Sequence, residues 1–78
     1  MHDEALETIK KIIGEKTGFS PKEITHETFI EDDLNIGEME LTEILVEVDE
    51  ALKVDLTSRK GAIDTIQDML DILSEEIE

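Results

Sequence analysis

Apolar side chains recur every three or four residues in three separate stretches of the chain, and each stretch predicts an amphipathic helix. The first covers residues 3–17, where Asp3 is a candidate N-cap and Gly18 follows the last helical residue. The second covers residues 38–52, and Gly37 before it is an acceptable N-cap. Both stretches therefore carry start and stop signals as well as the helical period.

The third stretch predicts a helix that begins at Asp64. Its carboxylate is expected to cap the helix while Gln67 reaches back to complete a capping box. Two shorter turns are also predicted. Ser20–Glu23 is a capping box with proline at its first helical position, and a helical turn is expected at residues 58–60.

These elements predict an all-α fold, a small four-helix bundle of three longer helices and one short one. The chain has 78 residues, which is enough for one domain, and we expect that domain to span residues 1–78. The long connection over residues 18–37 needs apolar anchors, and it has Ile24, Phe29, Ile30, Leu34 and Ile36. The predicted core consists of Leu6, Ile9, Ile13, Phe29, Leu41, Ile44, Leu45, Val48, Ile66, Leu70 and Leu73.

The chain has a formal net charge of −15, from 22 acidic and 7 basic residues, and this charge limits which macromolecules it can bind. Such a field repels nucleic acid and anionic membranes and favours proteins with basic patches. The chain has no cysteine, no pattern of a signal peptide and no apolar run that could span a membrane. We therefore expect a cytoplasmic monomer without disulfides.

Catalysis and metal binding have little support in the sequence, and we expect no enzyme activity. His2 is near the terminus and His26 is in the long loop, and neither has a nucleophile at a recognisable spacing. An EF-hand loop that starts at Asp32 would have apolar residues, Leu34 and Ile36, at its third and fifth positions. We expect weak divalent-ion binding at most.

Three segments together carry a family resemblance. The first is Phe29–Leu41, which resembles the F-x-E-D-L-G-x-D-S-L-D region of acyl carrier proteins, with one residue inserted upstream. Glu43–Glu50 is similar to the acidic second helix of that family, and Ile63–Leu73 to its I-T-T-V-Q-D-A-I-D-Y-I segment. The order, the spacing and the acidity cover most of the chain, which is identified as a member of that family.

The resemblance implies a carrier in acyl-group metabolism of the fatty acid or polyketide type. In that family, 4'-phosphopantetheine is joined to a serine at the start of the second helix, and the acidic second helix docks onto acyl transferases, synthases and phosphopantetheinyl transferase. Aligned with that helix, the surface expected to bind partners consists of Glu40, Glu43, Val46, Glu47 and Glu50. The stretch from Glu23 to Leu52 holds eleven acids and no Lys or Arg, which favours a cationic partner.

The attachment serine of the resemblance falls on Glu38, flanked by Gly37 and Met39. A carboxylate cannot form the phosphodiester, so the cofactor is not expected on this chain. Two interpretations of Glu38 remain. Either the attachment site is lost and Glu38 is simply an acid that suits the first turn of a helix, or its negative charge imitates the phosphate of the cofactor. Three functions remain open: a carrier-family module with an altered site, a regulatory or scaffold module that carries nothing, and an acidic bundle that responds to divalent ions.

Overall fold

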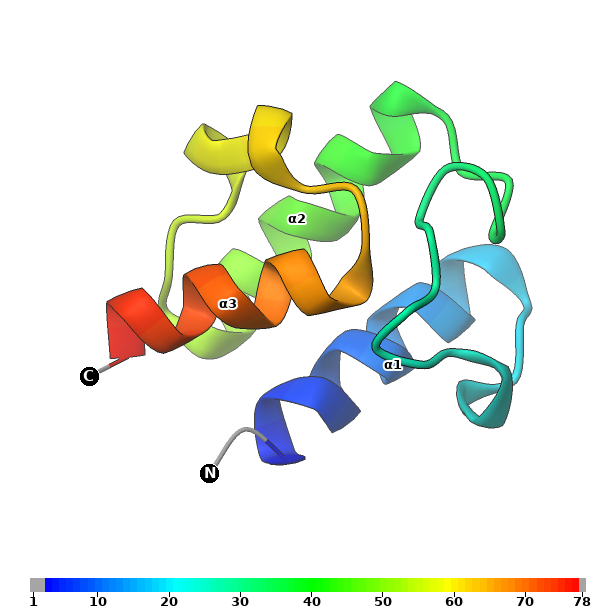
Figure 1. Cartoon of the computed structure of the whole chain (residues 1–78), viewed down its shortest axis with the longest axis horizontal. Coiled ribbons are helices and arrows are strands. Elements are labelled where there is room, and N and C mark those ends of the chain that lie inside the picture. Colours follow the sequence, from blue (N-terminus) through cyan, green and yellow to red (C-terminus); the bar gives the residue numbers. More distant parts are fainter. Residues whose placement is uncertain (1–2, 78) are drawn as a thin grey trace.

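The computed structural model describes residues 3–77, and their regular structure is helical (Figure 1). The three longer helices are α1 (Asp3–Thr17), α2 (Glu38–Leu52) and α3 (Ile66–Ile77). Two 3-10 helices, η1 (Pro21–Glu23) and η2 (Thr57–Ala62), lie in the connections. Within the described residues the single strand-like feature is an isolated bridge between Phe29 and Thr65. The predicted all-α architecture is confirmed.

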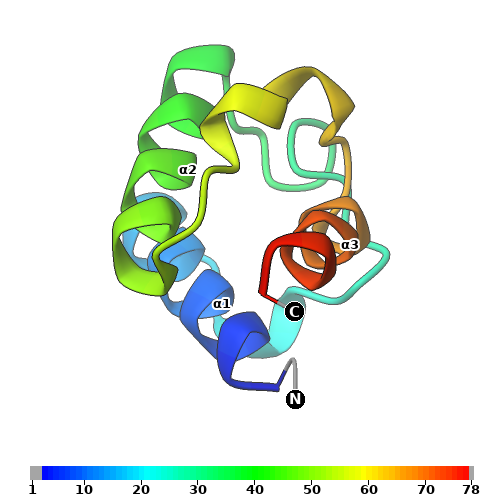
Figure 2. The same ribbon diagram turned by 90° about the vertical axis from the view of Figure 1, so that its left-hand side faces the viewer.

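The three α-helices surround a common interior, which Figure 2 shows in a view along α3. α1 packs against α2, and η2 also contacts α2. The long connection between η1 and α2 passes beside the start of α3 in both views (Figures 1 and 2). No helix of the described residues is long and apolar enough to cross a membrane.

Local signals set most helix boundaries. Gly18 ends α1 with φ +84°, a left-handed conformation that costs glycine least, and its N–H donates to the Gly14 carbonyl at 2.8 Å. The capping box at η1 is present: Ser20 Oγ accepts from the Lys22 N–H, and Glu23 accepts from the Ser20 N–H. These predictions are confirmed. The side chain of Asp3, our candidate N-cap of α1, is not among those that the structure describes.

The predicted start of α3 is wrong by two residues, and its cap is Thr65 instead of Asp64. Thr65 Oγ1 accepts from the Asp68 N–H at 3.2 Å, and the Asp68 carboxylate accepts from the Thr65 N–H at 3.0 Å and the Asp64 N–H at 2.8 Å. The Met69 N–H donates to the Thr65 carbonyl at 3.4 Å, as expected when Thr65 is the N-cap, whereas the Asp64 carbonyl accepts from the Ile30 N–H of the long connection at 2.9 Å. Gln67 bonds His26 and Asp71 instead of reaching back.

The loop anchors complete the core. Ile24, Ile30, Leu34 and Ile36 are buried, as expected for a long connection in a compact fold. Nine of the eleven predicted core residues are buried: Ile9, Ile13, Leu41, Ile44, Leu45, Val48, Ile66, Leu70 and Leu73. Leu6 is only partly buried at the edge.

Phe29, by contrast, is 49% exposed, so its assignment to the core is wrong. Thr28 and Ile30 on either side point inward in a locally extended segment, and successive side chains of such a segment point to opposite faces.

Candidate functional site

The N-terminus of α2 is held by backbone geometry and exposes its first side chains. Gly37 is the N-cap, its carbonyl accepts from the Leu41 N–H at 2.9 Å, and its own N–H donates to Glu40 Oε1 at 3.3 Å. The predicted cap is therefore confirmed. Glu38 is the first helical residue and is exposed, and Met39 is 81% exposed. The position at issue for cofactor attachment thus faces solvent.

Lys60 of η2 fastens this first turn. Its Nζ donates to the Glu38 carbonyl at 3.1 Å and to Thr42 Oγ1 at 2.7 Å, while Thr42 Oγ1 donates to the same carbonyl at 3.1 Å. A shallow groove of about 260 Å³ lies beside this junction, and Glu38, Lys60 and Asp64 are among its lining residues. No sequence pattern predicts this contact, because Lys60 lies 22 residues after Glu38.

One face of α2 combines two apolar side chains with carboxylates. Met39 and Val46 are seven residues apart, which is about two helical turns, so they lie on the same face. Val46 is 42% exposed, and Glu43 and Glu50 beside this line are exposed. This is the mixture of apolar and charged groups expected of a partner surface.

Lys16 of α1 reaches two of the five residues predicted to bind partners. Its Nζ lies 2.8 Å from Glu47 Oε2 and 3.6 Å from Glu43 Oε1. The hydrogen bond to Glu47, assisted by the charges of Glu47 and Glu43, raises the pKa of Lys16 above its ordinary value. Glu43 and Glu47 are thus partly neutralised within the chain, and Glu40 bonds the backbone of Gly37. Among the described residues, Val46 and Glu50 are the two of the five that make no such hydrogen bond or ion pair.

Asp49 belongs to the acidic helix but has a structural role. Its carboxylate accepts from the Leu56 N–H at 2.6 Å, from the Thr57 N–H at 3.2 Å and from Thr57 Oγ1 at 2.7 Å. It therefore fixes the start of η2 to α2. The acidic stripe of α2, which we define as Glu40, Glu43, Glu47, Asp49 and Glu50, therefore divides into residues that hold the fold and residues that face solvent.

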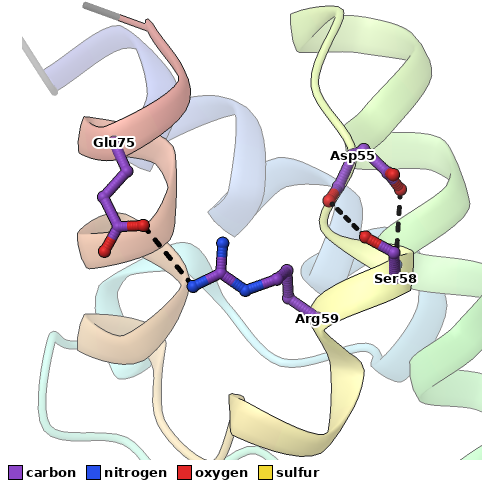
Figure 3. Close-up of polar contacts among 4 residues, drawn as sticks. All are labelled: Asp55, Ser58, Arg59 and Glu75. Atoms are coloured by element: carbon purple, nitrogen blue, oxygen red, sulfur yellow. Dashed lines mark hydrogen bonds and ion pairs between the residues drawn. The ribbon is translucent and has the colours of Figure 1, made fainter.

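The three serines lie outside α2. Ser20 Oγ caps η1, as predicted. Ser58 donates through Oγ to the Asp55 carbonyl at 3.4 Å and through its N–H to Asp55 Oδ1 at 3.3 Å, next to the Arg59–Glu75 ion pair that joins η2 to α3 (Figure 3). Ser74 is within α3. Each serine sits in a local structure unlike the exposed first turn of a long helix.

The remaining candidates for chemistry are dispersed. His26 is exposed, and His2 lies outside the described residues. Among residues 3–77, no group of three or more His, Asp or Glu side chains could hold a metal ion. Leu34 and Ile36, at the third and fifth positions of the EF-hand frame, are core residues. That frame therefore has apolar side chains facing inward where it needs oxygen ligands.

Comparison with known proteins supports the resemblance over nearly the whole chain. The chain is 26% identical to an acyl carrier protein of Buchnera aphidicola over 70 residues, which cover 88% of this chain and 90% of that protein. It is 26% identical to an acyl carrier protein of Rubrobacter xylanophilus over 74 residues, which cover 94% of this chain and 91% of that protein. No protein-family model matches the chain. The chain is acyl carrier protein-like in sequence and in its all-helical fold.

Proposed function

We propose that this chain is a non-enzymatic, acyl carrier protein-like module of acyl-group metabolism, of the fatty acid or polyketide type, that docks to partner enzymes through α2. The observation that carries the proposal is the near-full-length similarity to proteins named acyl carrier protein. The expected partners are acyl transferases, synthases and phosphopantetheinyl transferase with basic docking patches. The exposed line of Met39 and Val46, with Glu50 beside it, supports this docking face.

We further propose that Glu38 stands where such carriers have the attachment serine. The register is supported by Asn35, which has φ +55° and falls on the glycine of the family's D-L-G-x stretch. Asn is one of the residues that best tolerate this left-handed conformation, so it is a fitting replacement for glycine there. The residues at the start of α2 do not fit a 4'-phosphopantetheine arm, because a carboxylate offers no hydroxyl for the phosphodiester.

The role of Glu38 itself has two interpretations. As a first-turn acid, it interacts favourably with the positive end of the helix dipole, and no further role is needed. As a fixed negative charge in an exposed position, it would instead imitate the phosphate and preserve docking. Glu38→Gln keeps the shape but removes the charge, so partner binding that is unchanged in this variant supports the first interpretation.

The deciding experiment is intact mass spectrometry after incubation with coenzyme A and a broad-specificity phosphopantetheinyl transferase. We expect the mass of the unaltered protein to stay constant. The triple variant Gly37→Asp, Glu38→Ser and Met39→Leu should gain one phosphopantetheine group. The control variant Gly37→Asp and Met39→Leu, which keeps Glu38, should gain none.

Each other result has a defined meaning. A gain of mass by the unaltered protein would contradict the register at Glu38, and Ser20→Ala and Ser58→Ala would then locate the modified hydroxyl. A triple variant that stays unmodified would mean that the transferase does not recognise this surface. That result would favour the second candidate function, a regulatory or scaffold module that carries nothing.

A further inference from the structure

Phe29 is one of two aromatic residues in the chain, and its exposure is imposed by its neighbours. Thr28 is 7% exposed and Ile30 is 1% exposed, whereas Phe29 between them is 49% exposed. In an extended segment, successive side chains alternate between two faces, so burying Thr28 and Ile30 directs the Phe29 ring outward. A half-exposed phenylalanine forgoes the burial that it would gain in the core.

The backbone around Phe29 is fastened on both sides. The Ile30 N–H donates to the Asp64 carbonyl at 2.9 Å, and the Ile66 N–H donates to the Thr28 carbonyl at 3.1 Å. The Phe29 N–H donates to Asp33 Oδ2 at 2.8 Å. Turning the ring inward would break these hydrogen bonds. The backbone that directs the ring outward is therefore fixed, as it would be for a preorganised contact residue.

Two hollows adjoin Phe29. The larger, of about 550 Å³, has Phe29, Thr65 and Gln67 among its lining residues. The smaller, of about 170 Å³, is lined by Phe29 and by three acids, Glu31, Asp32 and Asp64. Phe29 thus lines both hollows, and the smaller one has three acids against one, Glu27, in the larger.

The rim of the larger hollow is ordered by a chain of side-chain hydrogen bonds. Gln67 Nε2 donates to Asp71 Oδ1 at 2.9 Å, which leaves Gln67 Oε1 as the acceptor for His26 Nδ1 at 3.0 Å. In neutral His26 the proton is then on Nδ1, and Nε2 is available to accept a hydrogen bond. The hollow therefore offers a polar group of fixed orientation beside the ring.

The charge around this surface selects the occupant. Glu27 is a fourth acid in the lining of the two hollows, and the segment from Glu23 to Leu52 has no Lys or Arg. A second copy of this chain, with net charge −15, would be repelled. An Arg or Lys side chain would meet carboxylates in the smaller hollow and the face of the Phe29 ring beside it.

We propose that Phe29 and its two hollows form a second docking surface, for a partner-protein segment with an aliphatic side chain next to an Arg or Lys. The aliphatic group occupies the larger hollow against the ring, and the cation occupies the acidic hollow. This surface lies on the long connection and the start of α3. It does not depend on α2 or on whether the chain carries an acyl group.

The test is a titration of the ¹⁵N-labelled protein with acetyl-Arg-Leu-Arg-Leu-Arg-amide, followed by amide chemical shifts. We expect saturable shifts at residues 26–33 and 64–67. Phe29→Ala should weaken binding by about tenfold or more, as for a central aromatic contact. Thr8→Ala, which shortens an uncharged, half-buried side chain on α1, should leave the dissociation constant within about twofold. Amide spectra that change only around the substituted residue will show that each variant is folded.

Two control peptides separate charge from shape. Acetyl-Arg-Ser-Arg-Ser-Arg-amide and acetyl-Gln-Leu-Gln-Leu-Gln-amide should each bind more weakly than the parent peptide. Equal binding of the serine peptide would overturn the proposal, because charge alone would then explain the contact. Shifts centred on residues 38–52, full affinity of Phe29→Ala, or no saturation at millimolar peptide would also overturn it.

Discussion

Adding salt should stabilise this fold, because like charges are concentrated along α2. Three pairs of glutamates lie three or four residues apart on this helix: Glu40–Glu43, Glu43–Glu47 and Glu47–Glu50. Each such pair costs about 0.2–0.5 kcal/mol, or about 1 kcal/mol for the three together. Lys16 offsets the pair Glu43–Glu47, to which it binds at both carboxylates. In the other two pairs, the outer members Glu40 and Glu50 have no cation within ion-pair distance among the described residues.

The range of screening determines how much of this repulsion salt removes. At 0.01 M salt the Debye length is about 30 Å, and at 0.15 M it is about 8 Å. The longest extent of the molecule is 30 Å, so at low salt every acid repels every other. At 0.15 M only near neighbours do. The same salt weakens the exposed ion pairs of Lys16 and Arg59, which makes the net gain smaller.

We therefore expect the free energy of unfolding to rise by about 0.5–1 kcal/mol between 0.01 M and 0.15 M NaCl. For a domain of this size, that corresponds to a rise in Tm of about 2–8 °C. The assay is thermal unfolding followed by circular dichroism at 222 nm. Sodium chloride is preferred because sulfate strengthens apolar burial by itself. A Tm that is unchanged or lower at 0.15 M would refute the reasoning.

A pair of matched variants assigns the effect to α2. Glu50→Gln removes one repulsive pair, so it should raise Tm at low salt and reduce the salt dependence. Glu7→Gln removes the same charge from α1, where Lys10 and Lys11 follow at favourable helical spacings. It should not raise Tm. Equal gains from both variants would mean that net charge, rather than its position on α2, governs stability.

Three further predictions concern stability. Two backbone N–H donors and the Thr65 side chain lower the pKa of Asp68 below its ordinary value of 3.8. The contribution of ionised Asp68 to the free energy of unfolding is therefore present above that pH and is lost as the pH falls through the lowered pKa. In urea titrations, the difference in unfolding free energy between the protein and Asp68→Asn should shrink on acidification, and a constant difference would contradict this. Leu45→Ala should cost about 2–5 kcal/mol in urea unfolding, because Leu45 is fully buried, whereas a loss no larger than that of exposed Val46→Ala would contradict the packing. Asp49→Ala should cost about 1–3 kcal/mol and reduce amide protection in η2, and the same effect from Glu50→Ala would show that charge alone is responsible.

Elements with local signals could be predicted from the amino-acid pattern alone. The bounds of α2 follow from its apolar period and from the N-cap at Gly37, and the end of α1 follows from Gly18. The capping box at Ser20 needs only residues three apart. Each of these signals acts within one or two helical turns, so a linear pattern contains all the information needed. The acidity of α2 and the absence of a serine at Glu38 are likewise read directly from the chain.

Two features could not be predicted from local pattern: which of two adjacent residues caps α3, and whether the Phe29 side chain faces the core or solvent. Both outcomes depend on hydrogen bonds between the long connection and residues 64–67, about 35–40 positions later. The contact of Lys16 with Glu47 is equally remote in sequence, and it leaves less of the acidic stripe exposed than the linear pattern suggests. Such contacts follow from how the helices pack, because spacing along one helix carries no information about which side chain of another helix will face it.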